Sequence, residues 1–398
     1  MHKRTLVTLA LSVAIGAFVA LFAKPAAAYP WMNRHGYNNC ASCHADPSGA
    51  GLLTPYGRAQ SELLLSSRYT KATEEDEPGR FSRALFGIVD LPDAVLIGGW
   101  VRNGYMWNNV DGRLVDRRFL QMRADVAAQI TVDHFRANAS VGYAGPDTSA
   151  LSEEAWVTSN RTGAHLVSRE HWFAWDASDA VTVRAGRLNL PFGLRNIEHT
   201  SWVRAETRTD FNQQQQHGAA IAFNNEHLRA EGMAIAGNFQ VNSDAYRERG
   251  ISGYAEWSFA QGQSVGVSTL VTHANADLGT RRETTRQAYG LFSRLSWERL
   301  AVLAEADFLT TSVKGSGTHI GVVGLLQADY ELVQGLHAIG TGEALRRPED
   351  TAKWGWGAWA SAAWFFLPHF DVRGDVVRRS GLGGPPSMTY LLQLHGYL

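Results

Sequence analysis

An alternation of apolar and polar side chains with a period of two residues runs through the chain from about residue 84 to its end. Between Leu120 and Val132 every even position is apolar, whereas the odd positions are mostly polar or charged. The pattern recurs in 135–143, 300–308 and 370–376. Because successive side chains of a β-strand point to opposite faces, each such segment has one apolar and one polar face. This part of the chain therefore has to fold as amphipathic β-strands.

The fold class expected from these strands is all-β, and two architectures share the alternation. It occurs in soluble β-sandwiches and in transmembrane barrels with a wet lumen. The polar face carries charges of both signs, as the lumen of a barrel does. Many strand candidates are also about ten residues or longer, against the usual ~5–6. Both features favour the transmembrane barrel.

Aromatic residues at the ends of one segment give a third reason. On the even face of 354–366, Trp354 and Trp356 lie at one end and Trp364 and Phe366 at the other, with alanines between them. Ten residues at ~3.3 Å each, tilted by about 40°, rise about 25 Å along the membrane normal, which is the spacing of the two aromatic girdles. The alternative is a tryptophan-rich core strand of a soluble protein. No apolar run after residue 30 approaches the ~18 residues that a membrane helix needs, so any membrane would be crossed by strands.

About sixteen strands are expected between residues 94 and 398, an even number as bacterial barrels require. The last segment, 390–398, has an alternating apolar face that ends with the printed sequence. Pairing of this segment with the first strand would close the barrel and remove its open edges. The expected starts are Ala94, Phe119, His134, Leu166, Val181, His217, His227, Gly250, Gln263, Arg286, Leu300, His319, Leu336, Trp354, His369 and Met388.

The first 28 residues differ from the rest and read as a secretory signal peptide. Basic residues at positions 2–4 precede an apolar stretch from Leu6 to Phe22, and Ala26–Ala28 offer a small-residue cleavage site. An uncleaved anchor helix is the alternative. The expected organisation is a signal peptide at 1–28, a small module at 29–67, a polar linker at 68–90 and the barrel at 91–398.

The only two cysteines of the chain stand in the sequence Cys40-Ala41-Ser42-Cys43-His44. This C-x-x-C-H spacing is the attachment signature of a c-type haem. Each thiol adds to one vinyl group at the porphyrin edge, and the histidine lies under the ring as the proximal iron ligand. The sequence therefore predicts one covalent haem c held by Cys40, Cys43 and His44. Attachment takes place outside the cytoplasm, which the signal peptide allows.

Two other uses of a cysteine pair compete with this prediction. One is a disulfide in an oxidising compartment, and the other is a thioredoxin-like redox pair in a βαβ context. The sequence around Cys40 has no strand–helix alternation, and neither use accounts for His44.

The other contacts of the haem are less defined by the sequence. The sixth ligand is left open among Met32, His35 and a residue of the barrel interior, with His35 as first choice. Arg58 is a candidate partner of a haem propionate, because its planar fork matches a carboxylate. The alternative for Arg58 is an exposed charge. With about 40 mature residues the module is too small for a large core, so the haem itself, with help from the barrel wall, has to provide its apolar centre.

Two stretches resemble known families. The segment Gly186–Arg195 resembles the "GRxxxPFG" segment of phosphate-selective-type porins, in which a strand ends in a turn that folds into the lumen. Residues 31–58, with Arg34, Gly36, the C-x-x-C-H motif and Tyr56-Gly57-Arg58, resemble the N-terminus of the fused monohaem cytochrome–porins. Those include the outer-membrane iron oxidases of iron-oxidising bacteria. The 46–54 loop departs from the iron-oxidase pattern. The resemblance therefore supports iron as the substrate less strongly than it supports an electron conduit.

The resemblance implies an electron conduit in the bacterial outer membrane, with the haem module plugging the barrel. The expected partners are outer-membrane lipid, a periplasmic c-type cytochrome, and an extracellular donor or acceptor such as Fe²⁺ or another cytochrome. Whether the chain counts as an enzyme, an iron oxidase, is left open. The net charge of −1 implies no nucleic-acid partner.

Two other functions compete with the conduit. One is a solute or anion porin with a haem-containing plug or sensor. The other is a periplasmic redox enzyme tethered to a barrel, although no second metal site or nucleophile–base pair appears in the sequence. Five acidic residues on the polar faces are candidates for attracting iron cations, or are ordinary lumen charges balanced by Arg123 and Arg373: Asp125, Glu305, Asp307, Asp371 and Asp375.

Overall fold

The structure is a computed structural model of the chain. It describes residues 32, 35, 37, 39–49, 51–69, 79, 83–143, 166–195, 198, 200–211, 214–241, 244–350 and 352–398. The signal peptide predicted at 1–28, most of the linker predicted at 68–90, and Arg34 and Gly36 lie outside the described residues.

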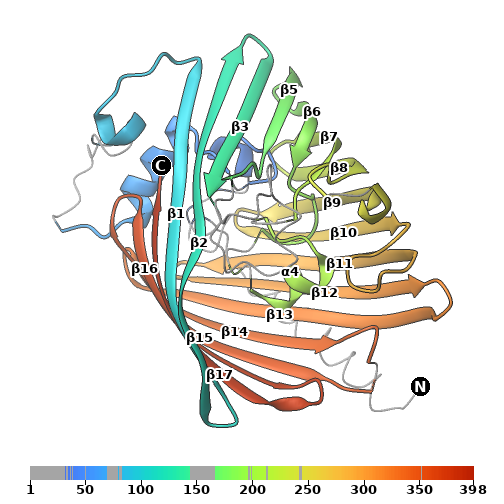
Figure 1. Cartoon of the computed structure of the whole chain (residues 1–398). Helices are drawn as coiled ribbons and strands as arrows, with labels where there is room; N and C mark the ends of the chain where they lie inside the picture. Colours follow the sequence, from blue (N-terminus) through green and yellow to red (C-terminus); the bar gives the residue numbers. More distant parts are fainter. Residues whose placement is uncertain are drawn as a thin grey trace.

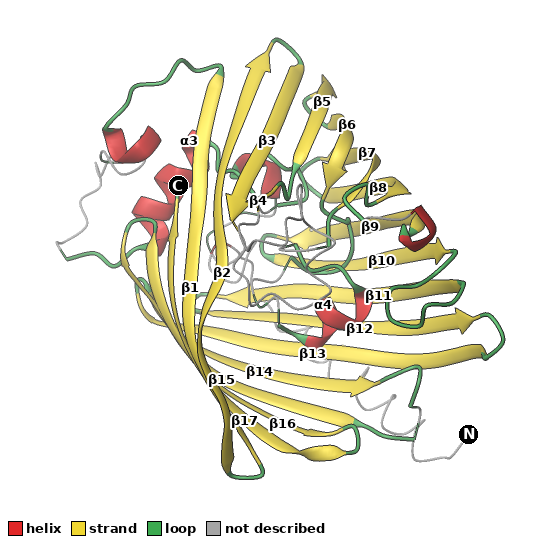
Figure 2. Cartoon of the chain, in the orientation of Figure 1, coloured by secondary structure: helices red, strands yellow, loops and turns green. Residues whose placement is uncertain are grey.

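Residues 95–397 form a closed antiparallel β-barrel (Figures 1 and 2). Its strands are β1 (Val95–Val110), β2 (Arg113–Val132), β3 (Phe135–Tyr143), β4 (Leu166–Val167), β5 (His171–Ser178), β6 (Val181–Leu188), β7 (Gln216–Asn224), β8 (Leu228–Gly237), β9 (Arg249–Ala260), β10 (Gln263–Ala274), β11 (Thr284–Trp297), β12 (Leu300–Val313), β13 (Gly317–Val333), β14 (Leu336–Arg346), β15 (Gly355–Leu367), β16 (Phe370–Gly381) and β17 (Gly384–Tyr397). Each main strand pairs with the next along the chain, and β17 pairs with β1.

The barrel has sixteen spanning strands, because β4 and β5 act as one. Both pair with β3, β4 at Gly142 and Tyr143 and β5 further along from Ala139 to Phe135. The seventeen segments of the sheet therefore amount to sixteen crossings of the barrel wall. This confirms the expected all-β barrel, the even strand number, and closure of the barrel by the C-terminal segment.

Most strands begin within two residues of the expected position, and two begin earlier. β2 starts at Arg113 instead of Phe119, and β17 starts at Gly384 instead of Met388. The additional residues at the start of β2, 113–118, are mostly exposed, and four of them are charged. The apolar alternation therefore does not extend to them. The start of β17 contains Pro385 and Pro386, residues that normally argue against a strand.

The polarity of the barrel is inverted relative to a soluble protein. Val126 and Ile130 on β2 are 62% and 55% exposed, whereas Arg123 and Asp125 on the same strand are 7% and 4% exposed. On β15 the even positions from Trp356 to Trp364 face outward and the odd positions are buried. Apolar side chains thus face the lipid and polar ones fill the lumen, as the sequence alternation predicted.

The two mouths of the barrel differ in their connections. At one mouth the strands are joined by turns of two or three residues, such as Asp133–His134 and Pro368–His369. A longer connection, 275–283 between β10 and β11, lies at the opposite mouth. β1 begins and β17 ends at the mouth with the short turns. In outer-membrane barrels the short turns face the periplasm and the long loops face outward.

The helical segments that the structure describes are short. They include η1 (Cys40–Ser42), α3 (Pro55–Gln60), η2 (Ser61–Leu65), η4 (Ala84–Gly87), α4 (Trp202–Thr207) and η6 (Asp244–Tyr246). Within the described residues, none of the helices has the length and apolar character needed to cross a membrane.

The N-terminal module, residues 39–69, is packed against the inner wall near the mouth with the short turns. Its Leu52 belongs to a buried cluster with Trp100 of β1 and Ala127 of β2. The Ser67 backbone N–H donates to the Phe365 carbonyl at 2.8 Å. Arg136 of β3 donates to the Ala45 carbonyl, also at 2.8 Å. The wall strands therefore complete the core that so short a module cannot build alone.

The connection between β6 and β7 fills another part of the lumen. After Leu188 the chain leaves the wall, and Phe192, Trp202 and Val203 are buried within the barrel (Figure 1 shows α4 inside the curve of the sheet). They form a large apolar cluster with inward-facing residues of β10–β14, among them Leu270 and Leu325. The expected inward fold after the Gly186–Arg195 segment is confirmed. Residues 189–211 are called the lumen plug below.

The inverted polarity generates a prediction about charges on the outer face. Leu326 lies halfway along β13 and is 57% exposed, and Leu332 lies at the short-turn end of the same strand and is 46% exposed. We expect Leu326→Arg to lower the free energy of unfolding by about 2–4 kcal/mol, and Leu332→Arg by about 0–1 kcal/mol, because the cost depends on depth in the bilayer. Denaturant titration of barrels folded into lipid vesicles measures both. Equal losses at the two positions would contradict this membrane placement.

Candidate functional site

The two cysteines lie in a tight turn whose geometry is fixed by backbone hydrogen bonds. Asn39 caps η1 by accepting from the Ala41 N–H at 3.0 Å. The N–H groups of Cys43 and His44 both donate to the Cys40 carbonyl, at 3.1 and 2.9 Å. This single turn brings Cys40, Cys43 and His44 to one side of the module, where all three line the same cavity.

Helix α3 packs directly on this turn. The Thr54 N–H donates to the Cys43 carbonyl at 3.0 Å, and the Thr54 side chain caps α3 by accepting from the Gly57 N–H. A Cβ atom at Gly57 would collide with the Cys43 carbonyl, so only glycine allows this approach. The position of the C-x-x-C-H turn therefore depends on the segment that follows it.

Both cysteines are free thiols in the structure. Within the described residues the turn belongs to no βαβ unit, which is the context that a thioredoxin-like pair needs. This argues against the thioredoxin-like alternative.

The loop after the motif is held by buried ion pairs. Asp46 is 1% exposed and forms an ion pair with Arg184 of β6, with a nitrogen–oxygen distance of 2.9 Å. Its carboxylate also accepts from the Ser48 N–H and hydroxyl. Arg195 of the lumen plug donates to the Ser48 hydroxyl at 2.6 Å. Through these bonds the module, the wall and the plug fix each other's positions.

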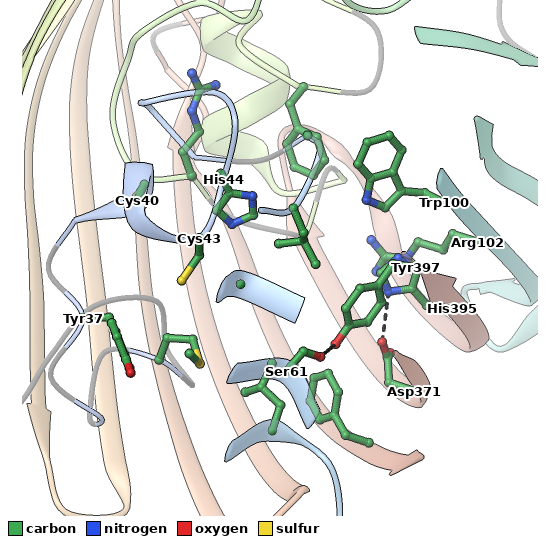
Figure 3. A pocket seen from close by; sticks show the side chains of 18 of the residues that line it. Tyr37, Cys40, Cys43, His44, Ser61, Trp100, Arg102, Asp371, His395 and Tyr397 are labelled. Atoms are coloured by element: carbon green, nitrogen blue, oxygen red, sulfur yellow. Dashed lines mark hydrogen bonds and ion pairs between the residues drawn. The ribbon is translucent and has the colours of Figure 1, made fainter. Parts of the chain in front are cut away.

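A partly enclosed cavity of about 210 Å³ opens beside the turn (Figure 3). Figure 3 shows Cys43 and His44 on the module side, with Trp100, Arg102, His395 and Tyr397 on the side of the barrel wall. Apolar side chains, among them Leu53, Leu65 and Phe365, form much of the remaining lining.

The structure brings together some of the sequence-predicted site residues and not others. Cys40, Cys43, His44 and Met32 line the cavity. Arg58 is buried on α3 and donates to the Ile97 carbonyl; it is not among the lining residues, so this position does not support contact with a propionate. His35 is exposed and also lies outside the cavity lining, which does not support it as an iron ligand.

Sequence analysis named Arg123 and Asp371 as lumen charges, but it did not place any polar residue of the barrel wall at the candidate haem site. Arg102 of β1, Arg123 of β2 and Arg195 of the plug surround the cavity with three guanidinium groups. His395 of β17 lines it as well and is hydrogen-bonded to Asp371 of β16. The alternation in the sequence shows that the wall residues face the lumen. It does not show that they meet around one cavity, because that depends on the pairing of β17 with β1.

Four of the five acids proposed for attracting cations are buried in the wall, Asp371 is half-buried, and most of the five are paired. Asp125 is bonded to Arg123 and Arg169, Glu305 to Arg204, Asp375 to Arg373, and Asp371 to His395. Asp307 is 1% exposed and shows no hydrogen-bond partner for either oxygen within the described residues. In the part of the chain that the structure describes, no group of three or more His, Cys, Asp or Glu side chains has a metal-holding arrangement. The interpretation as balanced lumen charges therefore fits better than an iron-attracting path.

Comparisons of the chain with known sequences found no match. No protein-family profile matches it, and no curated protein matches it.

Solved structures of outer-membrane proteins share the fold. Outer-membrane expressed OmpT of Vibrio cholerae matches with a TM-score of 0.59 at 12% identity, over 78% of this chain and 100% of that one. An anion-selective porin from Comamonas acidovorans matches with a TM-score of 0.58 at 11% identity, over 76% and 99% of the two chains. The channel DcaP of Acinetobacter baumannii gives 0.53 at 12% identity, over 76% and 97%. At such identities the likeness establishes the fold alone, which is that of a porin barrel.

The Asp46 contacts generate a prediction about acid stability. Burial opposes ionisation of Asp46, but Arg184 and Arg195 outweigh it and lower its pKa to about 2. A carboxylate with a depressed pKa stabilises the fold above its unfolded pKa of ~3.9, and this contribution is lost as the pH falls towards 2. The shift corresponds to about 2 kcal/mol.

We expect Asp46→Asn to lower the thermal midpoint of unfolding at pH 6. At pH 3 the difference in thermal midpoint between the variant and the wild type should be smaller. The exposed Asp90→Asn variant is the matched control, and an equal gap at both pH values would refute the assignment.

Proposed function

We propose that this chain is an outer-membrane protein that holds one covalent haem c inside its barrel and passes electrons across the membrane. The observation that carries the proposal is the cavity within the lumen that Cys40, Cys43 and His44 line together. A bilayer blocks electrons because its hydrocarbon contains no redox centre. A closed barrel can hold one at that depth while all its backbone hydrogen bonds stay satisfied.

The residues around the cavity fit the chemistry of a c-type haem. Cys40 and Cys43 would form the thioethers, and His44 would serve as the proximal ligand. The apolar lining suits the porphyrin ring. Arg102, Arg123 and Arg195 suit its two propionates better than Arg58 does, because guanidinium groups pair with carboxylates. When bound, the haem supplies a one-electron redox centre within the membrane span.

The two mouths suggest where the partners bind. If the short turns face the periplasm, the module lies at the periplasmic mouth, where we propose that a periplasmic c-type cytochrome docks. An extracellular donor or acceptor, such as Fe²⁺ or another cytochrome, would act from the long-loop side. The paired state of the lumen acids gives no support to iron specifically. The exposed apolar band implies outer-membrane lipid around the barrel.

The direct test uses haem-loaded protein in liposomes that contain a trapped redox dye. Dithionite or Fe²⁺ is added outside, and the haem and dye absorption are followed together. We expect reduction of the haem to precede that of the dye in the wild type and in the control variant Ser42→Ala, which alters an exposed residue of the same turn. The double variant Cys40→Ala/Cys43→Ala should lack covalent haem and transfer no electrons. A haem that is not reduced by either reagent would contradict the proposal of an electron conduit.

A solute or anion porin with a haem-containing plug is the second candidate. The porin fold of the barrel and the arginines around the cavity favour it. The lumen plug opposes it, because its apolar cluster with β10–β14 leaves less open lumen for solutes. Planar-bilayer recording separates the two functions. We expect small conductance for the intact protein, and conductance typical of open porins together with a redox-silent haem would favour the porin.

A further inference from the structure

His395 occupies a distinctive position on the wall of the cavity. It lies on β17 opposite Asp371 of β16 in the strand register, and its Nδ1 lies 2.9 Å from the Asp371 Oδ2. The ring also stacks on Tyr397 with centroids 5.1 Å apart. One neighbour on the adjacent strand and one on the same strand therefore hold the orientation of this imidazole.

The hydrogen bond to Asp371 engages Nδ1 and leaves Nε2 as the nitrogen available to a ligand. When Nδ1–H donates to the carboxylate, Nε2 carries the lone pair. A histidine that binds a metal almost always donates its other ring N–H to a carboxylate, carbonyl or water, which raises its basicity and fixes the ring. Figure 3 shows His395 and Asp371 bonded in this way on the wall, with His44 on the module side of the same cavity.

The module is also attached to this part of the wall. The hydroxyls of Ser61 and Tyr397 lie 2.7 Å apart, so η2 contacts the strand that carries His395. The wall histidine and the C-x-x-C-H turn are thereby held on two sides of one cavity by protein contacts alone. A ligand that bridges them would find both sides already in position, which lowers the cost of ordering.

We propose that His395, supported by Asp371, is the second axial ligand of the haem held by Cys40, Cys43 and His44. This inference rests on the proposed function, because it assumes that the haem is present. It gives the iron two imidazole ligands, one from the module and one from the barrel, and replaces His35, which lies outside the cavity.

Met32 is the rival ligand within the same cavity. Its thioether lines the cavity and packs on a buried apolar cluster with Leu65 and Phe365. A methionine ligand needs no hydrogen-bonded support, so the geometry of Met32 is also compatible with haem iron. The carboxylate behind His395 favours the histidine, and spectroscopy distinguishes the two.

The experiment compares His395→Ala, Met32→Ala and His337→Ala in full-length protein purified with haem. His337 is the matched control, since it is another lumen histidine bonded to an aspartate, Asp329 at 2.8 Å, but it does not line the cavity. Covalent haem is first quantified in each protein by its pyridine haemochrome spectrum. Heat-modified gel mobility confirms that each barrel is folded. The ligand set is then read from optical and electron paramagnetic resonance spectra.

We expect covalent haem in all four proteins and a low-spin, six-coordinate spectrum in the wild type and in the Met32 and His337 variants. His395→Ala should become high-spin, and added imidazole should restore the low-spin spectrum. Asp371→Asn should keep the ligand but let cyanide displace it about 10–100-fold more readily, the usual loss for a supporting carboxylate.

The outcomes separate this inference from the proposed function. Absence of covalent haem in the wild type would overturn the proposed function itself. Covalent haem with an unchanged spectrum in His395→Ala would overturn only the ligand assignment. If Met32→Ala alone became high-spin and the wild type showed the charge-transfer band of a thioether ligand, Met32 would take the place of His395.

Discussion

The width of a sixteen-stranded barrel is the constraint on which the rest of this structure depends. Side chains can fill a barrel of about eight strands, whereas barrels of 16–18 strands enclose a channel. The segments that occupy this channel determine what can cross the membrane through the barrel. Here the N-terminal module and the lumen plug both pack inside the wall, so the lumen is a core built from three separate parts of the chain.

Buried charge pairs hold these three parts together. Asp46 of the module is bonded to Arg184 of the wall, which is bonded in turn to Glu231 of β8. Such pairs contribute little net stability, because both charges lose their hydration. Removing one partner is costly, however, so each pair disfavours alternative arrangements in the lumen. We infer that the network serves to fix the position of the module more than to strengthen the barrel.

The sequence predicted those features that depend on local pattern. Period-two alternation predicted the strands and their inward and outward faces. The C-x-x-C-H spacing singled out Cys40, Cys43 and His44, and the structure places all three on one cavity. The wall of the cavity could not be predicted in this way. Arg102 and Gln393, which are hydrogen-bonded at 2.9 Å, are 291 residues apart in the sequence. The alternation shows which residues face the lumen, but not which of them lie at the same level along the barrel axis. Arg58 shows the opposite problem, because a local pattern suggested a ligand contact while the fold bonds its guanidinium to the Ile97 carbonyl.

The place where the barrel closes has a consequence for its assembly. Trp100 and Arg102 come from the first strand and His395 and Tyr397 from the last, and all four line the cavity. The seam between β1 and β17 is therefore one wall of the site. Covalent attachment of a haem needs access to both thiols, which a closed barrel with a packed module restricts. If the proposed haem is present, its attachment has to precede closure of this seam. The haem-bearing module then provides an apolar and charged surface on which the first and last strands can meet.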